Sequence, residues 1–463
     1  MTARAKELRI VEYAENLLLG FSFCERLSRR DLMDSQEFHS ISVELWLALA
    51  DTEKRMAHLR KRSKRRKRRW RQSSAVRRAS SELRQAHLNE WGLRGLVLEE
   101  RHAIIKQIGD ALAWSLALGD PRFTIPLYKP ATHQLPKDHS VDGVFRVLET
   151  AAGTSDYLVV PTDITRCCGT GDFLIRGARW PYPSPFEAKV KRQPDGTLLC
   201  MLHGWNPVFQ VRPEELERFK EAFGLTMPEE RVSFDERGER QKVEVHRSTS
   251  DAKDSLVSLT QHADPSLKRN WSNLEAVIER AVGGKVACDL AEPGLAYAAA
   301  PIRALGDLDN VWAPIIAAFR RIGVDALEGD WKFTKSLEAV LDEELSPVVL
   351  PIPLWKISSR LKSVLMAGQV ILVTASRTNL WTSAFRAERV ELTEEEDGTW
   401  RLSAAGRSQV FDAYDVIRLK YALWYAGVSP RHTARTVSAQ LYMPGFVYVD
   451  RYGFLDPPEA GNP

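Results

Sequence analysis

The sequence lacks the motifs of several large enzyme classes. Its 463 residues contain no GxxxxGK(S/T) phosphate-binding loop, no GxSxG nucleophile turn and no HExxH zinc-binding pair. Cysteine is scarce as well: the five cysteines include no CxxC pair, which argues against a zinc ribbon and for a reducing compartment. The sequence therefore does not predict a P-loop motor, a GxSxG hydrolase or a zinc protease.

Long apolar segments are also missing. No run approaches the roughly 18 to 20 apolar residues that span a bilayer. The first 30 residues carry charges throughout, in place of the apolar centre of a signal peptide. We therefore expect a cytoplasmic protein with no membrane partner.

What the sequence does contain is the composition of an ordinary globular protein, with 44% apolar and 27% charged residues. The net charge of +4 conceals one basic segment, residues 60–71 (RKRSKRRKRRWR), in which ten of twelve residues are Lys or Arg. Removing those ten charges from the total leaves −6. A mildly acidic body thus carries one strongly basic segment.

The pattern along the chain predicts an α+β protein of several domains, because the chain is longer than one hydrophobic core usually organises. We expect a helical region with the basic segment, a central core, a polar linker or insertion, a C-terminal α/β domain and a flexible tail. In order, these comprise residues 1–95, 96–225, 226–263, 264–454 and 455–463.

Apolar periodicity predicts the main elements. The core opens with a helix at 96–118, whose apolar stripe consists of Ile104, Ile105, Ile108, Leu112 and Leu116. In the C-terminal domain we expect helices at 274–282, 311–323 and 413–427. Strand-like runs in the same domain lie at 347–355, 368–376, 384–392 and 399–405.

One stretch of the core, residues 171–191 (GDFLIRGARWPYPSPFEAKVK), places two carboxylates and a lysine on strand-like segments. An antiparallel hairpin centred near residue 180 sets Asp172 opposite Ala188, between Glu187 and Lys189. Glu187 and Lys189 share one face because strand side chains alternate. A modest shift of register or a bulge would bring Asp172, Glu187 and Lys189 onto one small patch of the sheet.

This trio has a chemical use. Two adjacent carboxylates repel unless a divalent cation lies between them, and Mg²⁺ prefers carboxylate, water and phosphate oxygens. A nearby lysine can position a metal-bound water or help to deprotonate it. The D-x-K triplets at 251–253 and 330–332 lack this setting, since the first lies in a polar segment and the second has no partner strand.

Asp172 and the Glu187-Ala188-Lys189 triplet resemble the PD-(D/E)xK superfamily of restriction-endonuclease-like nucleases, over about residues 96–224. The resemblance implies a central mixed sheet flanked by helices, Mg²⁺ or Mn²⁺ held by Asp172 and Glu187, and a water assisted by Lys189. Gly171 stands where the family name has Pro. Many members add an acid on the preceding helix, and the candidates here are Glu100 and Asp110, with Asp163 as a third.

The basic segment predicts a polyanionic partner, because no acid within it neutralises its charge. The residues that we expect to bind nucleic acid are Arg62, Lys64, Arg65, Arg66, Lys67, Arg68 and Arg69. The combined prediction is a Mg²⁺-dependent nuclease acting on DNA, in restriction, repair or antiviral defence, alone, as a homodimer or with a partner protein. The alternative is a non-catalytic nucleic-acid-binding or scaffold protein, in which the trio is a surface ion pair or a degenerate core.

Overall fold

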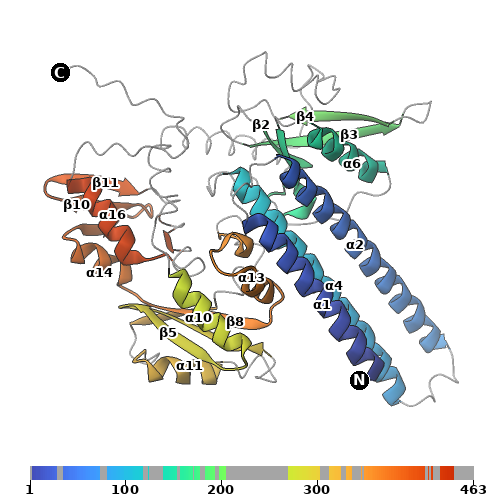
Figure 1. Cartoon of the computed structure of the whole chain (residues 1–463), viewed down its shortest axis with the longest axis horizontal. Coiled ribbons are helices and arrows are strands. Elements are labelled where there is room, and N and C mark those ends of the chain that lie inside the picture. Colours follow the sequence, from blue (N-terminus) through green and yellow to red (C-terminus); the bar gives the residue numbers. More distant parts are fainter. Residues whose placement is uncertain are drawn as a thin grey trace. The chain divides into compact units, whose positions relative to one another are not determined.

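The structure of the chain is a computed structural model (Figure 1). It describes residues 3–28, 35–72, 81–117, 124, 139–153, 157–169, 171–177, 183–192, 198–204, 270–302, 312–324, 330–335, 346, 349–411, 416, 419–420 and 428–442. Within these ranges, the side chains of residues 3–10, 66–91, 139–143, 146, 187–192, 198–204, 335, 436, 439–440 and 442 are outside the description. The expected helix at 413–427 lies almost wholly outside the described residues, and the linker and the tail lie wholly outside them.

The chain forms two compact units. Unit 1 comprises Met1–Leu118, Phe123–Val245 and Leu337–Ile371, and unit 2 comprises the remainder. The units therefore combine the segments 1–95 and 96–225, which we separated on sequence, and divide the segment 264–454. The division arises because the stretch around residues 349–366 packs on the N-terminal helices, as described below.

Three long helices dominate unit 1: α1 (Ala3–Ser28), α2 (Ser35–Gln72) and α4 (Ser81–Leu116). α4 packs against both α1 and α2. The expected apolar stripe of α4 is confirmed, because all five of its residues are fully buried. The helix begins at Ser81, well before the expected residue 96, since no proline interrupts residues 81–95.

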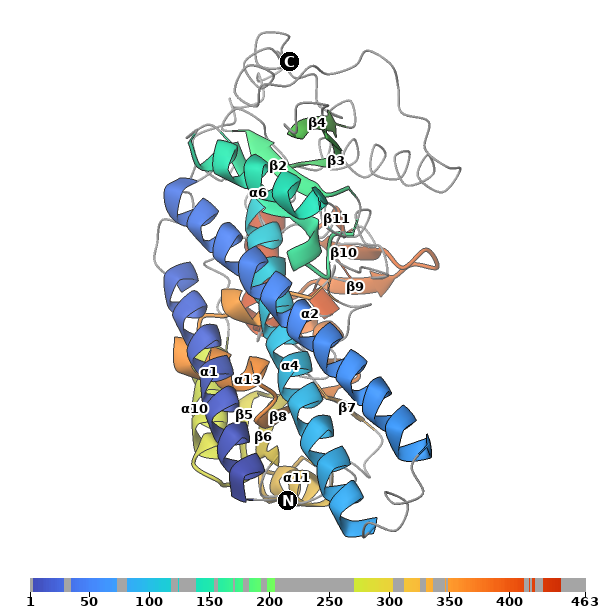
Figure 2. The same ribbon diagram turned by 90° about the vertical axis from the view of Figure 1, so that its right-hand side faces the viewer.

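A four-stranded sheet lies at one end of these helices (Figure 2). The helix α6 (His139–Ala152) and the second helix α2 pack against its first strand. The strands, in order across the sheet, are β1 (Tyr157–Pro161), β2 (Phe173–Gly177), β3 (Ser184–Arg192) and β4 (Leu198–Gly204), and a 3-10 turn, η1 (Thr162–Ile164), follows β1.

The expectation of a mixed sheet is wrong for these four strands, which pair antiparallel throughout. The reason is the length of the connections: β2 to β3 and β3 to β4 are joined by a few residues each. A parallel neighbour would need a crossover of a dozen residues or more. The expected helix after this region, at 213–223, lies outside the described residues.

A distant part of the sequence completes unit 1. The 3-10 turn η4 (Ile352–Leu354) and the helix α13 (Ser359–Met366) pack against α1 and α4. Ser363 Oγ donates to the carbonyl of Leu17 at 2.6 Å, and Lys362 Nζ donates to Ser28 Oγ at 2.9 Å. The strand expected at 347–355 is wrong, because two prolines, at positions 351 and 353, break it into a turn.

Unit 2 contains a four-stranded sheet of strand order β5-β6-β8-β7, with helices α10 (Trp271–Val282) and α11 (Trp312–Arg321) packed on it. The strands are β5 (Ala287–Glu292), β6 (Leu295–Pro301), β7 (Trp331–Lys335) and β8 (Val370–Arg377). β5 pairs antiparallel with β6, and β7 with β8. The amide of Arg377 donates to the carbonyl of Gly294 at 2.9 Å, so the end of β8 meets the start of β6. The domain is therefore α+β in its described part, and the expected α/β class is corrected.

A second, smaller sheet follows in unit 2. Its elements are α14 (Leu380–Ala387), β9 (Glu391–Glu394), β10 (Trp400–Ala404), β11 (Arg407–Phe411) and α16 (Pro430–Tyr442). The expected strand at 384–392 is wrong in its first half. That half completes α14, in which Leu380, Ala384 and Phe385 are buried at helical spacing. No helix in the described part of the chain is long and apolar enough to cross a membrane.

Candidate active site

The predicted hairpin of β2 and β3 is present, and it brings Asp172 against β3. The amide of Asp172 donates to the carbonyl of Phe186 at 2.7 Å. Phe173 is the Cα partner of Phe186, whereas the expected register would pair it with Glu187. The observed register is thus shifted by one residue relative to the expected one. The residue that follows Phe186 along β3, on the side of Asp172, is Glu187. Asp172, which is half-buried, therefore lies beside Glu187 in the backbone.

Gly171 allows this close approach. Its φ is +77°, a left-handed conformation, and a Cβ there would lie 2.7 Å from the carbonyl oxygen of Phe186. Neither proline, whose φ is fixed near −65°, nor any residue with a Cβ fits without displacing β3. The glycine before Asp172 is therefore a requirement of this hairpin.

Glu187 and Lys189 occupy alternate positions of β3 and pair with His203 and Met201 of β4. Their side chains lie outside the described part of the structure. What the backbone establishes is proximity: Asp172 and the Glu-x-Lys triplet are on adjacent strands, which lie about 5 Å apart in a sheet.

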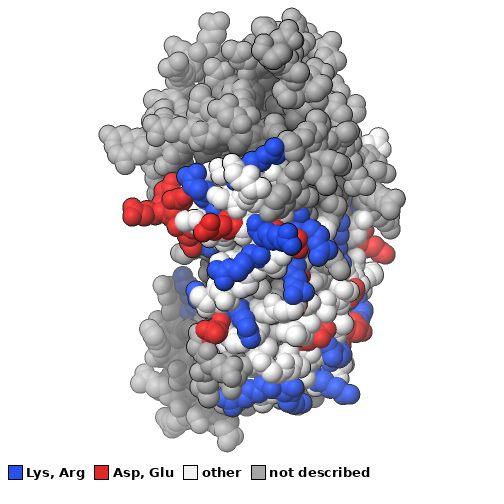
Figure 3. Space-filling model, turned by 90° about the vertical axis from the view of Figure 1, so that its left-hand side faces the viewer, with Lys and Arg blue, Asp and Glu red and all other residues white. Residues whose placement is uncertain are grey.

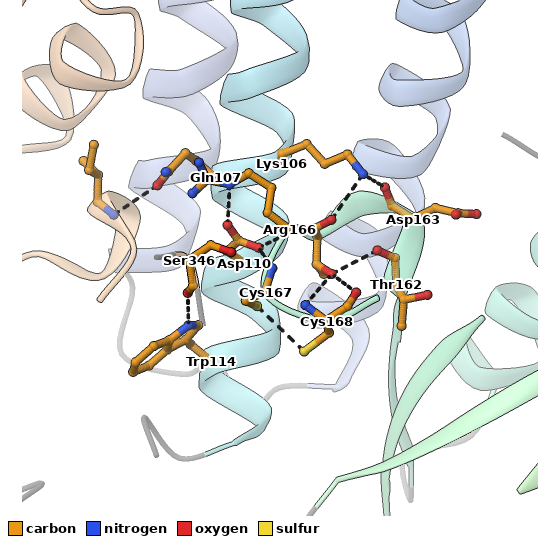
Figure 4. A network of polar contacts seen from close by, with 12 residues as sticks. Lys106, Gln107, Asp110, Trp114, Thr162, Asp163, Arg166, Cys167, Cys168 and Ser346 are labelled. Atoms are coloured by element: carbon orange, nitrogen blue, oxygen red, sulfur yellow. Dashed lines mark hydrogen bonds and ion pairs between the residues drawn. The ribbon is translucent and has the colours of Figure 1, made fainter. Parts of the chain in front are cut away.

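Asp110 lies almost opposite the apolar stripe of α4 in the helical periodicity, yet it faces the core. It is fully buried, and its carboxylate accepts from the Arg166 amide at 2.5 Å, the Cys167 amide at 2.9 Å and Arg166 Nε at 2.8 Å (Figure 4). Three donors thus occupy the two oxygens. Asp110 acts as an anchor for the loop after η1, and it could ligate a cation only by releasing that loop.

Lys106 fixes the same loop one helical turn earlier on α4. Its buried ammonium donates to the carbonyls of Asp163 and Thr165. Thr165 Oγ1 in turn donates to the carbonyl of Cys168 at 2.6 Å. α4 comes so close to η1 that a Cβ at Gly109 would lie 1.8 Å from the carbonyl oxygen of Ile164. The loop from β1 to β2 is therefore held rigidly against α4.

Asp163 is the acid that remains outside this network. Figure 4 shows its carboxylate pointing away from Asp110 and Arg166. Burial raises the pKa of Asp163; Lys106 opposes this, and the negative charge of Glu53 on α2 adds to it. Glu53 itself lies 3.7 Å from His102 Nε2. The charge of Glu53 thus acts on Asp163 where α2 packs against η1. Asp172 is close to η1 in the backbone, because its carbonyl accepts from the Thr162 amide at 3.0 Å.

Sequence analysis missed Glu53. It lies in the charged stretch DTEKR of α2, and no spacing rule connects it to residues more than a hundred positions away. Three acids were candidates for the extra ligand. Asp163 is next to Thr162, whose amide bonds to Asp172, whereas Asp110 is bound to Arg166 and Cys167. Glu100 is half-buried on α4. Glu100 is not among the groups that set the pKa of Asp163.

The basic segment forms the last turns of α2. Arg60, Lys61, Arg62, Lys64 and Arg65 are all exposed. Positions 66–69 continue the same helix, although their side chains lie outside the description. These five side chains cover slightly more than half of the helix circumference, and the half-buried Ser63 lies on the remaining side. One broad side of this part of α2 is therefore basic and open to solvent.

The neighbouring cysteines are structural. Cys167 and Cys168 are buried, with their sulfur atoms 3.7 Å apart. Burial raises the pKa of the Cys167 thiol well above its ordinary value. A buried thiol with a raised pKa is a poor nucleophile, so the pair serves as core packing next to Asp110.

We expect Asp163→Asn to raise the melting temperature of the metal-free protein at pH 7. Burial raises the pKa of Asp163, so its contribution to stability is complete below about pH 4 and is lost as the pH rises through the raised value. Asn removes that loss. Thermal melts in EDTA at pH 4 and pH 7 would test this, with the gain confined to the higher pH.

Asp397→Asn is the matched control for that experiment. Hydrogen bonds from Thr399 lower the pKa of Asp397, so the same chemical change should lower the melting temperature at pH 7. Equal shifts of the melting temperature in both variants would contradict the assignment of Asp163 as a carboxylate whose ionised form is disfavoured in the folded protein.

Among the described residues, no group of three or more His, Cys, Asp or Glu side chains is arranged to hold a metal ion. The side chain of Glu187 lies outside that set. Comparison of the chain with protein-family models, with curated proteins and with solved structures finds no match.

Proposed function

We propose that this protein is a metal-dependent nuclease that hydrolyses phosphodiester bonds of DNA. The observation that carries the proposal is the β2–β3 hairpin, in which the amide of Asp172 bonds to the residue before the Glu187-Ala188-Lys189 triplet. Two carboxylates and a lysine on adjacent strands are the groups that a hydrolytic metal centre requires. The raised pKa of Asp163 supports the same site.

The residues fit a hard divalent cation. Carboxylate oxygens are the ligands that Mg²⁺ and Mn²⁺ prefer, and Asp172 and Glu187 would hold the ion. Asp163 and Glu53 would add negative charge near the ion. Burial is the main cause of the raised pKa of Asp163, and the charge of Glu53 adds to it. A bound Mg²⁺ would polarise the phosphate and lower the pKa of a coordinated water.

The chain's own groups have separate tasks in this proposal. Lys189 orients the attacking water and balances the charge that builds on the phosphate oxygens. Lys106 and Asp110 fix residues 163–167, which keeps the backbone at Asp163 in place. The exposed basic turns of α2 bind the phosphate backbone, which positions the DNA without reading its sequence. Such an activity suits restriction, repair or defence against foreign DNA.

The test is cleavage of supercoiled plasmid and of circular single-stranded DNA by the purified native chain. With Mg²⁺ or Mn²⁺ we expect nicked and linear products from the plasmid, and with EDTA or with Ca²⁺ in place of Mg²⁺ we expect none. Cleavage in EDTA at the rate seen with Mg²⁺ would contradict metal dependence.

A second function has its own observation, the exposed basic turns of α2. A non-catalytic nucleic-acid-binding or scaffold protein would use them without the acids. It predicts tight, salt-sensitive binding that no metal alters and no cleavage under any of the conditions above. Binding without cleavage in both Mg²⁺ and Mn²⁺ would favour this second function.

A further inference from the structure

One unbroken helix joins the candidate active site to the basic turns. α2 runs from Ser35 to Gln72 and packs against η1, the turn next to Asp172. The same helix carries both Glu53, whose charge acts on Asp163 of η1, and the run at residues 60–71. Figures 1 and 2 both place its last turns at the end of the helical body farthest from the sheet β1–β4. The distance between the acids and the cations is therefore set by a rigid element.

That distance follows from helix geometry. At a rise of 1.5 Å per residue, Arg60 lies about 10 Å beyond Glu53 along the axis, and Arg71 lies about 27 Å beyond it. A base pair of duplex DNA occupies about 3.4 Å of its axis. The basic turns therefore reach phosphates up to about 8 base pairs from the active site.

The rigidity of the helix favours one kind of nucleic acid. The ten basic residues of the run occupy positions around most of the helix circumference, so a bound duplex contacts those on one side of α2. A straight duplex, whose persistence length is about 500 Å, stays alongside a rigid helix over the whole length of the run. A flexible single strand must first be ordered to do so.

The face of the molecule drawn in Figure 3 also carries Lys and Arg side chains, which gather in the middle and along the lower end with uncharged and acidic surface between the two groups. In unit 2, Lys420 and Arg401 are also paired with Glu394 and Glu395 at 2.8 Å. By contrast, no acid lies between residues 54 and 72 of α2.

We propose that α2 acts as a ruler for double-stranded DNA, binding the backbone on one side of the cut bond and requiring about 8 base pairs of duplex there. The proposal rests on the proposed nuclease function for the position of the cut. It adds the substrate class, duplex, and a minimum length on one side.

The test maps cleavage positions on an end-labelled linear duplex of about 60 base pairs with blunt ends. We expect the native chain to make no cut within about 8 base pairs of the end on one side of the cut strand, because the basic turns would have no phosphates to bind there. Cuts that approach both ends equally closely would overturn the ruler.

Two matched variants, each losing five charges, separate distance from affinity. The outer variant replaces Arg66, Lys67, Arg68, Arg69 and Arg71 by Gln, and the inner variant replaces Arg60, Lys61, Arg62, Lys64 and Arg65 by Gln. Both should reduce the slope of log affinity against log salt, by at most about 4 to 5. Only the outer variant should shorten the uncut zone, to about 5 base pairs, since Arg65 lies about 18 Å beyond Glu53.

Binding supplies a readout that does not need cleavage. Fluorescence anisotropy of the Asp172→Asn variant against duplexes of 4 to 20 base pairs should show affinity rising steeply to about 8 base pairs, and only to about 5 with the outer substitutions added. That result without any cleavage by the native chain would overturn the nuclease proposal and keep the duplex-binding helix. A flat length dependence, or equal affinity for single strands of the same length, would overturn the ruler.

Discussion

Asp172→Asn is expected to lower the rate of metal-dependent DNA cleavage by about 10³-fold or more, with an unchanged melting temperature in EDTA. The loss is large because the substitution removes a negative charge from the proposed cation site. The fold is expected to persist because Asn keeps the backbone amide and carbonyl that bond to Phe186 and Thr162, and is close in size to Asp. Initial rates on supercoiled plasmid at saturating Mg²⁺ measure the effect.

A second D-x-K triplet provides the control. Trp331 and Lys332 lie in β7, which pairs with β8, so the expectation that this triplet has no partner strand is wrong. Asp330 is exposed just before β7, and Asp330→Asn should leave the cleavage rate unchanged. Lys189→Met should reproduce the loss seen with Asp172→Asn, since it removes the group assigned to the water. A native-like rate in the folded Asp172→Asn variant would exclude this hairpin as the catalytic centre.

The largest effect on stability is expected from Asp110→Ala. The substitution would leave the buried Arg166 guanidinium and two backbone amides without the carboxylate that accepts from them. Removing one partner of a buried ion pair typically lowers the free energy of unfolding by about 3 to 5 kcal/mol. Urea titration followed by circular dichroism would measure the shift of the unfolding transition of the helical unit.

An exposed ion pair is the comparison for that experiment. Lys420 and Glu394 approach to 2.8 Å on the surface of unit 2, and Glu394→Ala should cost less than about 1 kcal/mol. If Asp110→Ala were no more destabilising than Glu394→Ala, the buried network of Figure 4 would not anchor the loop. Asp110→Asn keeps one acceptor oxygen and should fall between the two.

Local patterns predicted the parts of the fold that depend on neighbouring residues. The buried face of α4 follows from apolar residues at helical spacing, and the β2–β3 hairpin follows from two alternating runs around a proline-containing turn. The position of Asp172 beside the Glu-x-Lys triplet could therefore be derived from about twenty residues of sequence. Its register was missed by one residue, because Ile175 pairs with Ser184, which centres the hairpin half a residue before position 180.

Features that depend on distant residues were not predictable in this way. Asp110 is buried because a loop more than fifty residues later supplies its three donors. Glu53 affects Asp163 only because α2 packs against η1. The stretch 384–387 is helical because α14 packs against α16 and β9 and buries Ala384 and Phe385. Tertiary contacts decide these cases, and single-sequence periodicity does not contain them.

The packing of α13 against α1 has a consequence for biosynthesis. The hydrogen bond from Ser363 to Leu17 joins residues 346 positions apart, and part of unit 2 is encoded between them. At about 5 to 20 residues per second, α1 leaves the ribosome roughly 20 to 70 s before its partner helix is made. The buried faces of the N-terminal helices must stay covered by one another, or by a chaperone, during that interval.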